Sequence, residues 1–177
     1  MKNQLHNGGN QFYINMLDVS CIIINYNTSN YTYEAVRSLY ETHKNNLNFE
    51  IIVVDNASKK DDYTNLKSKL ESLHKSNLKL IRSSINTGFG GGNMLGVSNA
   101  SPTKYYAFIN NDTLQVSEYC LKYLMEFLEA QPQAGLCSPQ MLDEHQNFRV
   151  TIDHFSSLQR EILRRPFLET FFPKIYL

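Results

Sequence analysis

Two runs of apolar residues place the strongest limit on how this chain of 177 residues can fold. Residues 19–24 and 51–54 are apolar at nearly every position, and each run stops abruptly at a polar residue, Asn25 or Asp55. A strand with apolar side chains on both faces belongs in the interior of a parallel sheet that helices cover on both sides. Both runs therefore predict central strands of an α/β fold.

Further strand patterns alternate with helical ones along the chain. Residues 78–82 and 105–109 have strand character, the latter as a run of five apolar or aromatic residues that predicts a buried strand. Residues 136–139 are compatible with a short fifth strand, which Pro139 limits to an end or an edge. Strands and helices alternating at this spacing predict a doubly wound, mainly parallel sheet sandwiched by helices.

The overall composition excludes several classes of protein. Lysine plus arginine equals aspartate plus glutamate, at 17 each, so no strong field favours nucleic acid as a partner. The cysteines are odd in number, and Cys21 and Cys137 lie in apolar runs, which indicates reduced core residues and a cytoplasmic protein. No stretch approaches the roughly 20 apolar residues of a membrane span, and the amino terminus has no secretory signal pattern.

The patterns divide the chain into three parts. Residues 1–17 are a polar lead-in, residues 18–142 form the α/β domain, and residues 143–177 are a basic and aromatic segment. A segment with this much apolar surface seldom stands free in water. We expect it to pack on the domain, to meet a partner or a membrane surface, or to continue into further protein.

A polar sequence follows the strand predicted at residues 105–109. In an extended segment residues i and i+2 point the same way, so Asn110 and Asp112 are expected to project together from the carboxyl end of the strand. Open α/β sheets bind ligands at that edge. Two hard oxygen ligands suit Mg²⁺ or Mn²⁺, which takes further ligands from substrate phosphates. An ordinary strand-to-helix turn is the alternative explanation.

Residues 86–93 form a glycine-rich segment after the third predicted strand. Its consecutive glycines, residues 90–92, would let the backbone approach a ligand closely and expose amide donors. The segment does not fit a dinucleotide-binding fingerprint, because Asn93 stands where the last glycine belongs and the motif follows the wrong strand. Tight packing of a helix on the sheet explains the glycines equally well.

Taken together, four segments resemble the family 2 glycosyltransferases of the GT-A fold, and within them the bacterial rhamnosyltransferase-like branch. The segments are residues 22–27, 51–58, 86–93 and 109–113, and they occur in the family's order within residues 18–142. The resemblance implies a nucleotide-sugar-binding domain with a dTDP- or UDP-sugar as the favoured donor.

The resemblance also implies roles for particular residues around the nucleotide. Asp55 is similar to the acid that hydrogen-bonds the nucleotide base, and the segment after the first strand lines the same pocket. The residues implied to bind the donor nucleotide are Asn25, Tyr26, Asn27, Asp55 and Asn56.

Asn110 and Asp112 resemble the family's D-x-D element, which holds Mg²⁺ or Mn²⁺ on the diphosphate. The first position is Asn here, so one ligand is neutral. The residues implied to border the sugar and the diphosphate are Gly88, Phe89, Gly90, Asn93 and Asn111.

The reaction implied by the resemblance is transfer of the sugar to a glycan or lipid-linked acceptor with inversion, and such acceptors suggest peripheral contact with the membrane. Attack by an acceptor hydroxyl needs a general base. Asp143, Glu144 and Asp153 match no catalytic motif of the family, so the base is not identified in this chain. We therefore expect the chain to correspond to the donor-binding part of a longer enzyme.

Other functions remain as alternatives or are excluded. A catalytically inactive nucleotide-sugar-binding module, or a truncated fragment, would account for the missing base. A nucleotidyltransferase of related architecture would need a basic, glycine-rich loop after the first strand, and residues 25–30 contain neither glycine nor lysine. A nicotinamide-dependent oxidoreductase is excluded by the glycine pattern described above.

Overall fold

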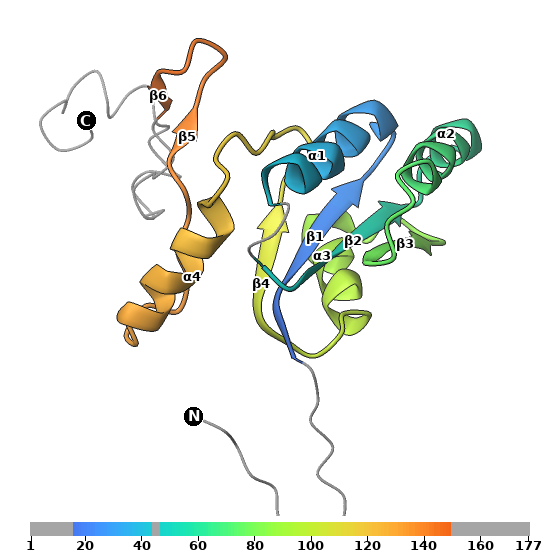
Figure 1. The fold of residues 1–177 in the computed structure, drawn as a ribbon. Helices are drawn as coiled ribbons and strands as arrows, with labels where there is room; N and C mark the ends of the chain where they lie inside the picture. The colour runs from blue at the N-terminus through green and yellow to red at the C-terminus, as the bar shows by residue number, and fades with distance from the viewer. Residues whose placement is uncertain (1–15, 44–46, 150–177) are drawn as a thin grey trace, which may run out of the picture. The chain divides into compact units, whose positions relative to one another are not determined.

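The computed structural model describes residues 16–43 and 47–149, which fall into two units that divide between Gly135 and Leu136. In the first unit, parallel strands form a sheet in the order β3-β2-β1-β4 (Figure 1). The predicted α/β fold with a mainly parallel sheet is confirmed. The strands are β1 (Leu17–Asn25), β2 (Phe49–Asn56), β3 (Leu78–Ser83) and β4 (Thr103–Ile109).

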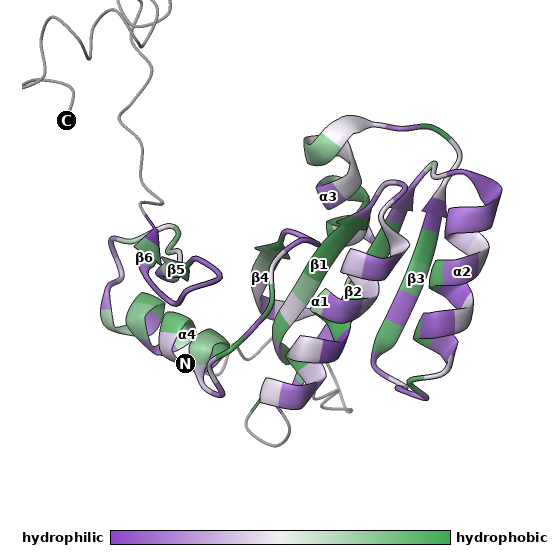
Figure 2. Cartoon of the chain, turned by 90° about the horizontal axis from the view of Figure 1, so that it is seen from above, coloured by the Kyte–Doolittle hydropathy of each residue, from purple (hydrophilic) through white to green (hydrophobic). Residues whose placement is uncertain are grey.

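Helices cover both faces of this sheet (Figures 1 and 2). The main core lies between one face and helices α1 (Ser29–Thr42) and α2 (Lys60–Glu71), where alternate residues of β1 and β2 are fully buried. Helix α3 (Gly88–Ser98) packs on the opposite face against β1 and β2. Helix α4 (Cys120–Ala130) joins the main core through Leu121.

The glycines of α3 divide between two explanations that the sequence left open. A Cβ atom on Gly96 would lie 2.5 Å from Ile22 Cγ2, and one on Gly92 would lie 2.6 Å from Ile24 Cδ1, so both glycines are needed for packing on β1. A Cβ atom on Gly88 or Gly90 would have nothing within 4 Å. Packing on β1 therefore explains Gly92 and Gly96, but it does not explain Gly88 and Gly90 in the first turn of α3.

Strand β4 differs from its prediction as a buried strand. Tyr105, Ala107 and Ile109 pack against the core, whereas Tyr106 and Phe108 are 44% and 52% exposed. The reason is the strand order: β4 lies at an edge of the sheet, and α3 covers β1 and β2 on the other face.

The second unit has a short antiparallel pair, β5 (Met141–Leu142) and β6 (Phe148–Arg149). The strand predicted at residues 136–139 is wrong; pairing begins after Pro139, which has no N–H to donate. Residues 1–15 and 150–177, including Asp153 and most of the basic and aromatic segment, lie outside the described residues. Within residues 16–43 and 47–149, no helix has the length and apolar character needed to span a membrane.

Candidate functional site

The parallel strands end together at one edge of the sheet, and most of the residues singled out in the sequence lie there. The chain moves outward from β1 through β2 to β3 and then returns to add β4 on the other side of β1. The carboxyl ends of β1 and β4 therefore flank the point where the strand order reverses. In open α/β sheets this is the place where ligands bind.

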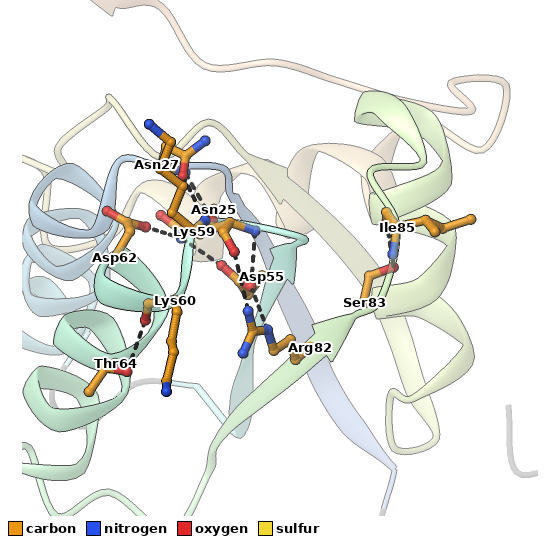
Figure 3. Close-up of polar contacts among 11 residues, drawn as sticks. Asn25, Asn27, Asp55, Lys59, Lys60, Asp62, Thr64, Arg82, Ser83 and Ile85 are labelled. Carbon is orange, nitrogen blue, oxygen red and sulfur yellow. Dashed lines mark hydrogen bonds and ion pairs between the residues drawn. The ribbon is translucent and has the colours of Figure 1, made fainter.

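Asn25, at the end of β1, connects the segments that surround this edge. Its side chain is fully buried, and Nδ2 lies 2.9 Å from Asp55 Oδ1 and 2.9 Å from Asp62 Oδ2 (Figure 3). Its Oδ1 accepts a hydrogen bond of 2.8 Å from Thr32 Oγ1 on α1. Asn25 therefore positions the loops after β1 and β2 from beneath the surface.

Asp55, at the end of β2, is also fully buried, and both of its oxygens have partners. Oδ1 accepts from Asn25, and Oδ2 accepts from the backbone N–H of Ser58 at 3.3 Å. Oδ2 also lies 3.5 Å from Nε of Arg82 on β3 (Figure 3). Asp55 itself does not reach solvent, but its neighbour Arg82 does, because the Arg82 side chain is 40% exposed.

Asp62, in the first turn of α2, completes this network. Its Oδ1 accepts a 3.0 Å hydrogen bond from the backbone N–H of Ser29 at the start of α1. Burial acts to raise the pKa of Asp62, but hydrogen bonds from Asn25 and Ser29 outweigh it and hold the pKa below its ordinary value. Asp62 is therefore a carboxylate at neutral pH and ties α2 to α1.

The loop after β1 places Tyr26 and Asn27 at the surface. Asn27 has a left-handed backbone with φ 56°, which Asn tolerates better than most residues. Its N–H donates to Ser58 Oγ at 2.9 Å, and its Oδ1 accepts from the backbone N–H of Lys59 at 2.9 Å. Tyr26 is 49% exposed beside this junction, so its ring is accessible to a ligand.

Asn56 holds the glycine-rich segment from below. It is 2% exposed; Nδ2 donates to Asn86 Oδ1 and to the carbonyl of Gly88, and Oδ1 accepts from the backbone N–H of Thr87. Gly88 has φ 71°, a conformation that favours glycine. Of the other residues predicted there, Phe89 and Gly90 are exposed and Asn93 is buried.

Residues 110–112 form a turn and not the extended segment expected from the sequence. β4 ends at Ile109, and the N–H of Thr113 donates to the carbonyl of Asn110 at 3.2 Å. Asn110 and Asp112 are both exposed. Asn111 points back toward α1, where its Nδ2 donates to the hydroxyls of Thr28 and Thr32 at 2.6 and 2.9 Å.

The donor set at this turn suits only certain metal ions. It offers one carboxylate, Asp112, and one amide oxygen, Asn110, and the described residues contain no cluster of His, Cys, Asp and Glu that could hold a metal alone. A closed structural zinc site needs more protein ligands. Mg²⁺ and Mn²⁺ keep several waters and take oxygen ligands from phosphates, so this turn fits them.

A pocket of about 430 Å³ opens at the same edge, beside the ends of β2 and β3. Arg82 stands in its wall, and the sequence did not indicate this residue, Ser58 or Asp62. Their available signal was position: Ser58 and Asp62 follow the second apolar run, and Arg82 ends the third strand. The pocket is lined by Ala57, Ser58, Arg82, Ser83 and Ser84.

Solved structures with a similar fold come from different organisms. Staphylococcus aureus TarS 1–349 has a TM-score of 0.53 and 24% identity over 65% of this chain and 33% of that chain, and has also been solved with UDP-GlcNAc. A Pyrobaculum calidifontis mannosyltransferase, PcManGT, in complex with GDP-Man and Mn²⁺, has a TM-score of 0.57 and 19% identity. The match covers 64% of this chain and 32% of the mannosyltransferase chain.

This chain thus spans about a third of the length of these structures, and their likeness is one of fold, that of the GT-A glycosyltransferases. No curated protein matches the sequence. The family model of "Glycosyl transferase family 2" matches residues 20–173, which is most of the chain. The chain therefore belongs to glycosyl transferase family 2.

Proposed function

We propose that this domain binds the nucleoside diphosphate of a sugar donor at the carboxyl edge of its sheet and serves in transfer of that sugar with inversion. A dTDP- or UDP-sugar is the favoured donor, and the acceptor is a glycan or a lipid-linked glycan. The rhamnosyltransferase-like branch is favoured by the Asn110-Asn111-Asp112 sequence, which has Asn in its first position. Solved structures of similar fold carry UDP-GlcNAc or GDP-Man with Mn²⁺, which supports a nucleotide-sugar donor.

One observation supports this proposal above the others. Hydrogen bonds around Asn25 connect the ends of β1 and β2, helix α1 and the turn after β4 at one edge of the sheet. Asn25 contacts Asp55 from β2 and Thr32 from α1, and Thr32 in turn accepts from Asn111 after β4. The pocket beside Arg82 and the exposed Asp112 turn are therefore parts of one connected framework. A nucleoside diphosphate has a base for the pocket and two phosphates that need a cation.

The proposed roles follow the exposure of each residue. Asn25, Asp55 and Asn56 are buried and position the loops, while the exposed Tyr26 and Asn27 border the nucleotide. Gly88, Phe89, Gly90 and Asn93 border the sugar and diphosphate, with Asn111 fixing the turn that presents Asn110 and Asp112. Mg²⁺ or Mn²⁺ held by Asn110 and Asp112 would offset the negative charge that develops on the departing diphosphate.

Binding without transfer is a second candidate function, favoured by the state of the acids in the second unit. Asp143 accepts hydrogen bonds from the backbone N–H groups of Asn147 and His145, and these bonds hold its pKa below the ordinary value. A carboxylate stabilised in its ionised form is a weak general base. Glu144 is exposed in the same turn. We assign neither residue as the base.

Calorimetric titration with UDP, dTDP and GDP, each with and without Mn²⁺, tests the proposal. We expect one nucleotide to bind about tenfold more tightly with the metal. Asp112→Ala should remove that gain, because the turn loses its charged ligand. Asp18→Ala is the matched control, since Asp18 lies at the opposite edge of the sheet beside Lys104 and should leave binding unchanged.

Failure to bind any of these nucleotides would contradict the proposed function. If Asp112→Ala kept the same Mn²⁺-dependent gain as the parent chain, only the role of Asp112 would be contradicted. Release of nucleoside diphosphate from a bound nucleotide sugar on addition of acceptor distinguishes transfer from binding alone.

A further inference from the structure

Strand β3 ends the sheet on the side away from β4, and helix α2 runs beside it (Figures 1 and 2). Within residues 16–43 and 47–149, β3 pairs only with β2, so the backbone groups on its outer side have no strand partner. An open strand edge is a template on which a further strand can pair. Charged side chains near such an edge decide which strands it can receive.

A groove of about 730 Å³ lies between α2 and this edge, and it shares no lining residue with the pocket at the carboxyl edge. The apolar part of the groove is formed by Leu70 of α2 and by Leu78 and Leu80 of β3. Leu70 is buried, whereas Leu78 and Leu80 are half-buried and pack on the main core. Leu78 and Leu80 are alternate residues of a strand, so every second side chain of a strand added to β3 would lie beside them.

Basic side chains predominate on the rim of this groove. The described residues that line it include Lys67, His74 and Lys75 but one acid, Glu71. Glu71 lies 3.8 Å from Lys67 and therefore offsets the charge of that lysine. Lys75 Nζ lies 5.0 Å from the centre of the Tyr40 ring, which carries no formal charge at neutral pH. Lys75 thus keeps a positive charge that a partner with acidic side chains can meet.

The basic residues of β3 itself do not close the edge. Lysines on many edge strands prevent pairing with another chain. Here Lys79 is paired with Glu50 at 2.8 Å, and Arg82 lies 3.5 Å from Asp55, so buried acids of β2 hold both basic side chains. A second copy of this chain is a poor occupant, because it would bring an equally basic rim to the same place, and like charges across paired strands are destabilising.

We propose that the groove between α2 and β3 binds an extended segment of a partner protein, which adds as a strand beside β3 and turns apolar and acidic side chains toward α2. Backbone hydrogen bonds to β3 provide affinity in this mode of binding, and the groove provides specificity. The leucines select apolar side chains and Lys75 selects an acidic one. This inference is separate from the proposed function, because it involves no residue assigned to nucleotide binding.

Labelled peptides of alternating pattern test the proposal. The first is acetyl-Glu-Thr-Val-Thr-Ile-Thr-Glu-amide, and the second has Lys in place of both Glu residues. Fluorescence anisotropy with the full chain should show that the acidic peptide binds at least about tenfold more tightly than the basic one. A third peptide, acidic but with alternate backbone nitrogens methylated, should bind at least about tenfold more weakly than the first, because it cannot complete the ladder with β3.

Charge reversal at the rim provides the matched pair of variants. Lys75→Glu should weaken binding of the acidic peptide by about fivefold or more and strengthen binding of the basic peptide. Unfolding would weaken both, so this reversal cannot come from loss of structure. Lys69→Glu is the control: Lys69 also lies on α2, but its Nζ donates to Asn30 Oδ1 on α1 at 2.6 Å and lines no part of the groove. This variant should bind both peptides as the parent chain does.

Each other outcome would overturn the proposal. No binding of the acidic peptide at about 1 mM, or equal binding of the acidic and basic peptides, would remove the evidence for an acidic partner. Unchanged affinity of the methylated peptide would exclude pairing with β3. Sedimentation equilibrium of the chain alone gives a further test, since a dimer that Lys75→Glu dissociates would assign the groove to a second copy.

Discussion

β2 has a buried carboxylate near each of its ends, and the two carboxylates have different uses. Glu50, at the amino end, is 3% exposed, and Asp55, at the carboxyl end, is fully buried. Each is paired with a basic residue of the neighbouring strand β3: Lys79 lies 2.8 Å from Glu50, and Arg82 lies 3.5 Å from Asp55. Each end of β2 therefore has the same arrangement, a buried acid on β2 paired with a basic residue on β3.

The difference lies in what else the basic partner contacts. Lys79 Nζ also donates to the carbonyl of Asn99 and to Ser101 Oγ, and Ser101 donates from its backbone to Glu50 at 2.7 Å. These bonds close the amino end around the residues after α3. Arg82 instead lines a pocket. The two ends therefore differ in whether other residues enclose the basic member of the ion pair, as at Lys79, or leave it lining a pocket, as at Arg82.

Removal of each acid tests the difference between the two ends of β2, and its expected effect is the largest. Glu50→Ala and Asp55→Ala should each lower the free energy of unfolding by about 2–3 kcal/mol, because buried groups that donate to each acid, such as Ser20 for Glu50 and Asn25 for Asp55, are left without an acceptor. Only Asp55→Ala should weaken nucleotide binding, by about tenfold, and equally for the free nucleoside diphosphate and the nucleotide sugar. Urea unfolding and calorimetry measure the two effects.

Equal weakening of nucleotide binding by Glu50→Ala would remove the distinction between the two ends. Loss confined to the nucleotide sugar in Asp55→Ala would put Asp55 near the sugar and not near the base.

Strand β1 has one polar side chain beside each of these acids, Ser20 beside Glu50 and Asn25 beside Asp55, and their replacement should have smaller effects, taken together. Asn25→Ala should lower the free energy of unfolding by about 2–3 kcal/mol, because Asp55, Asp62 and Thr32 all lose a buried partner. Ser20→Ala should cost about 1 kcal/mol, since Ser20 Oγ donates only to Glu50. Urea titration measures the free energy of unfolding of both variants. Equal losses would mean that Asn25 does not stabilise more partners than Ser20 does.

The smallest expected effect is on the pH dependence of stability. Burial raises the pKa of Glu50, but hydrogen bonds from Lys79, Ser20 and Ser101 outweigh it, so the pKa is lowered in the folded protein. The stabilisation is therefore present above the unfolded pKa, about 4.3, and is lost as the pH falls through the lower folded value. Glu50→Gln should flatten the acid limb of unfolding measured against pH.

Asp62 at the other end has a lowered pKa as well, so Asp62→Asn should flatten the same limb by a similar mechanism. If Glu50→Gln left the acid limb unchanged, the hydrogen bonds at the amino end would not favour the ionised form as the geometry indicates.

Much of the fold could be predicted because its signals are local. The apolar runs that became β1 and β2 have apolar side chains on both faces, and only a strand in the middle of a covered sheet can bury both. The burial of β4 could not be predicted in the same way, since its run is as apolar but its place at the edge leaves Tyr106 and Phe108 exposed.

The candidate site was predicted in part for the same reason. Polar residues at the ends of apolar runs were expected at one edge. Asn25 and Asp55 do lie at the carboxyl ends of the parallel strands β1 and β2, and Asp112 lies in the turn after β4. The shape of residues 110–112 could not be predicted, because Asn and Asp favour turns and extended strand ends alike. Arg82 could not be identified either, since nothing near it in the sequence distinguishes it from Lys79.

The sequence by itself determined which segments are strands and helices and which polar residues end each strand, because both depend on the order of apolar and polar residues along a short stretch of chain. The tertiary structure decided which of those polar residues are buried and support the loops, and which are exposed at the edge of the sheet. Asp55 meets Arg82 only because β2 and β3 pair in the register that places these two residues side by side. That register, and the open space beside Arg82, arise from packing between elements far apart in the sequence.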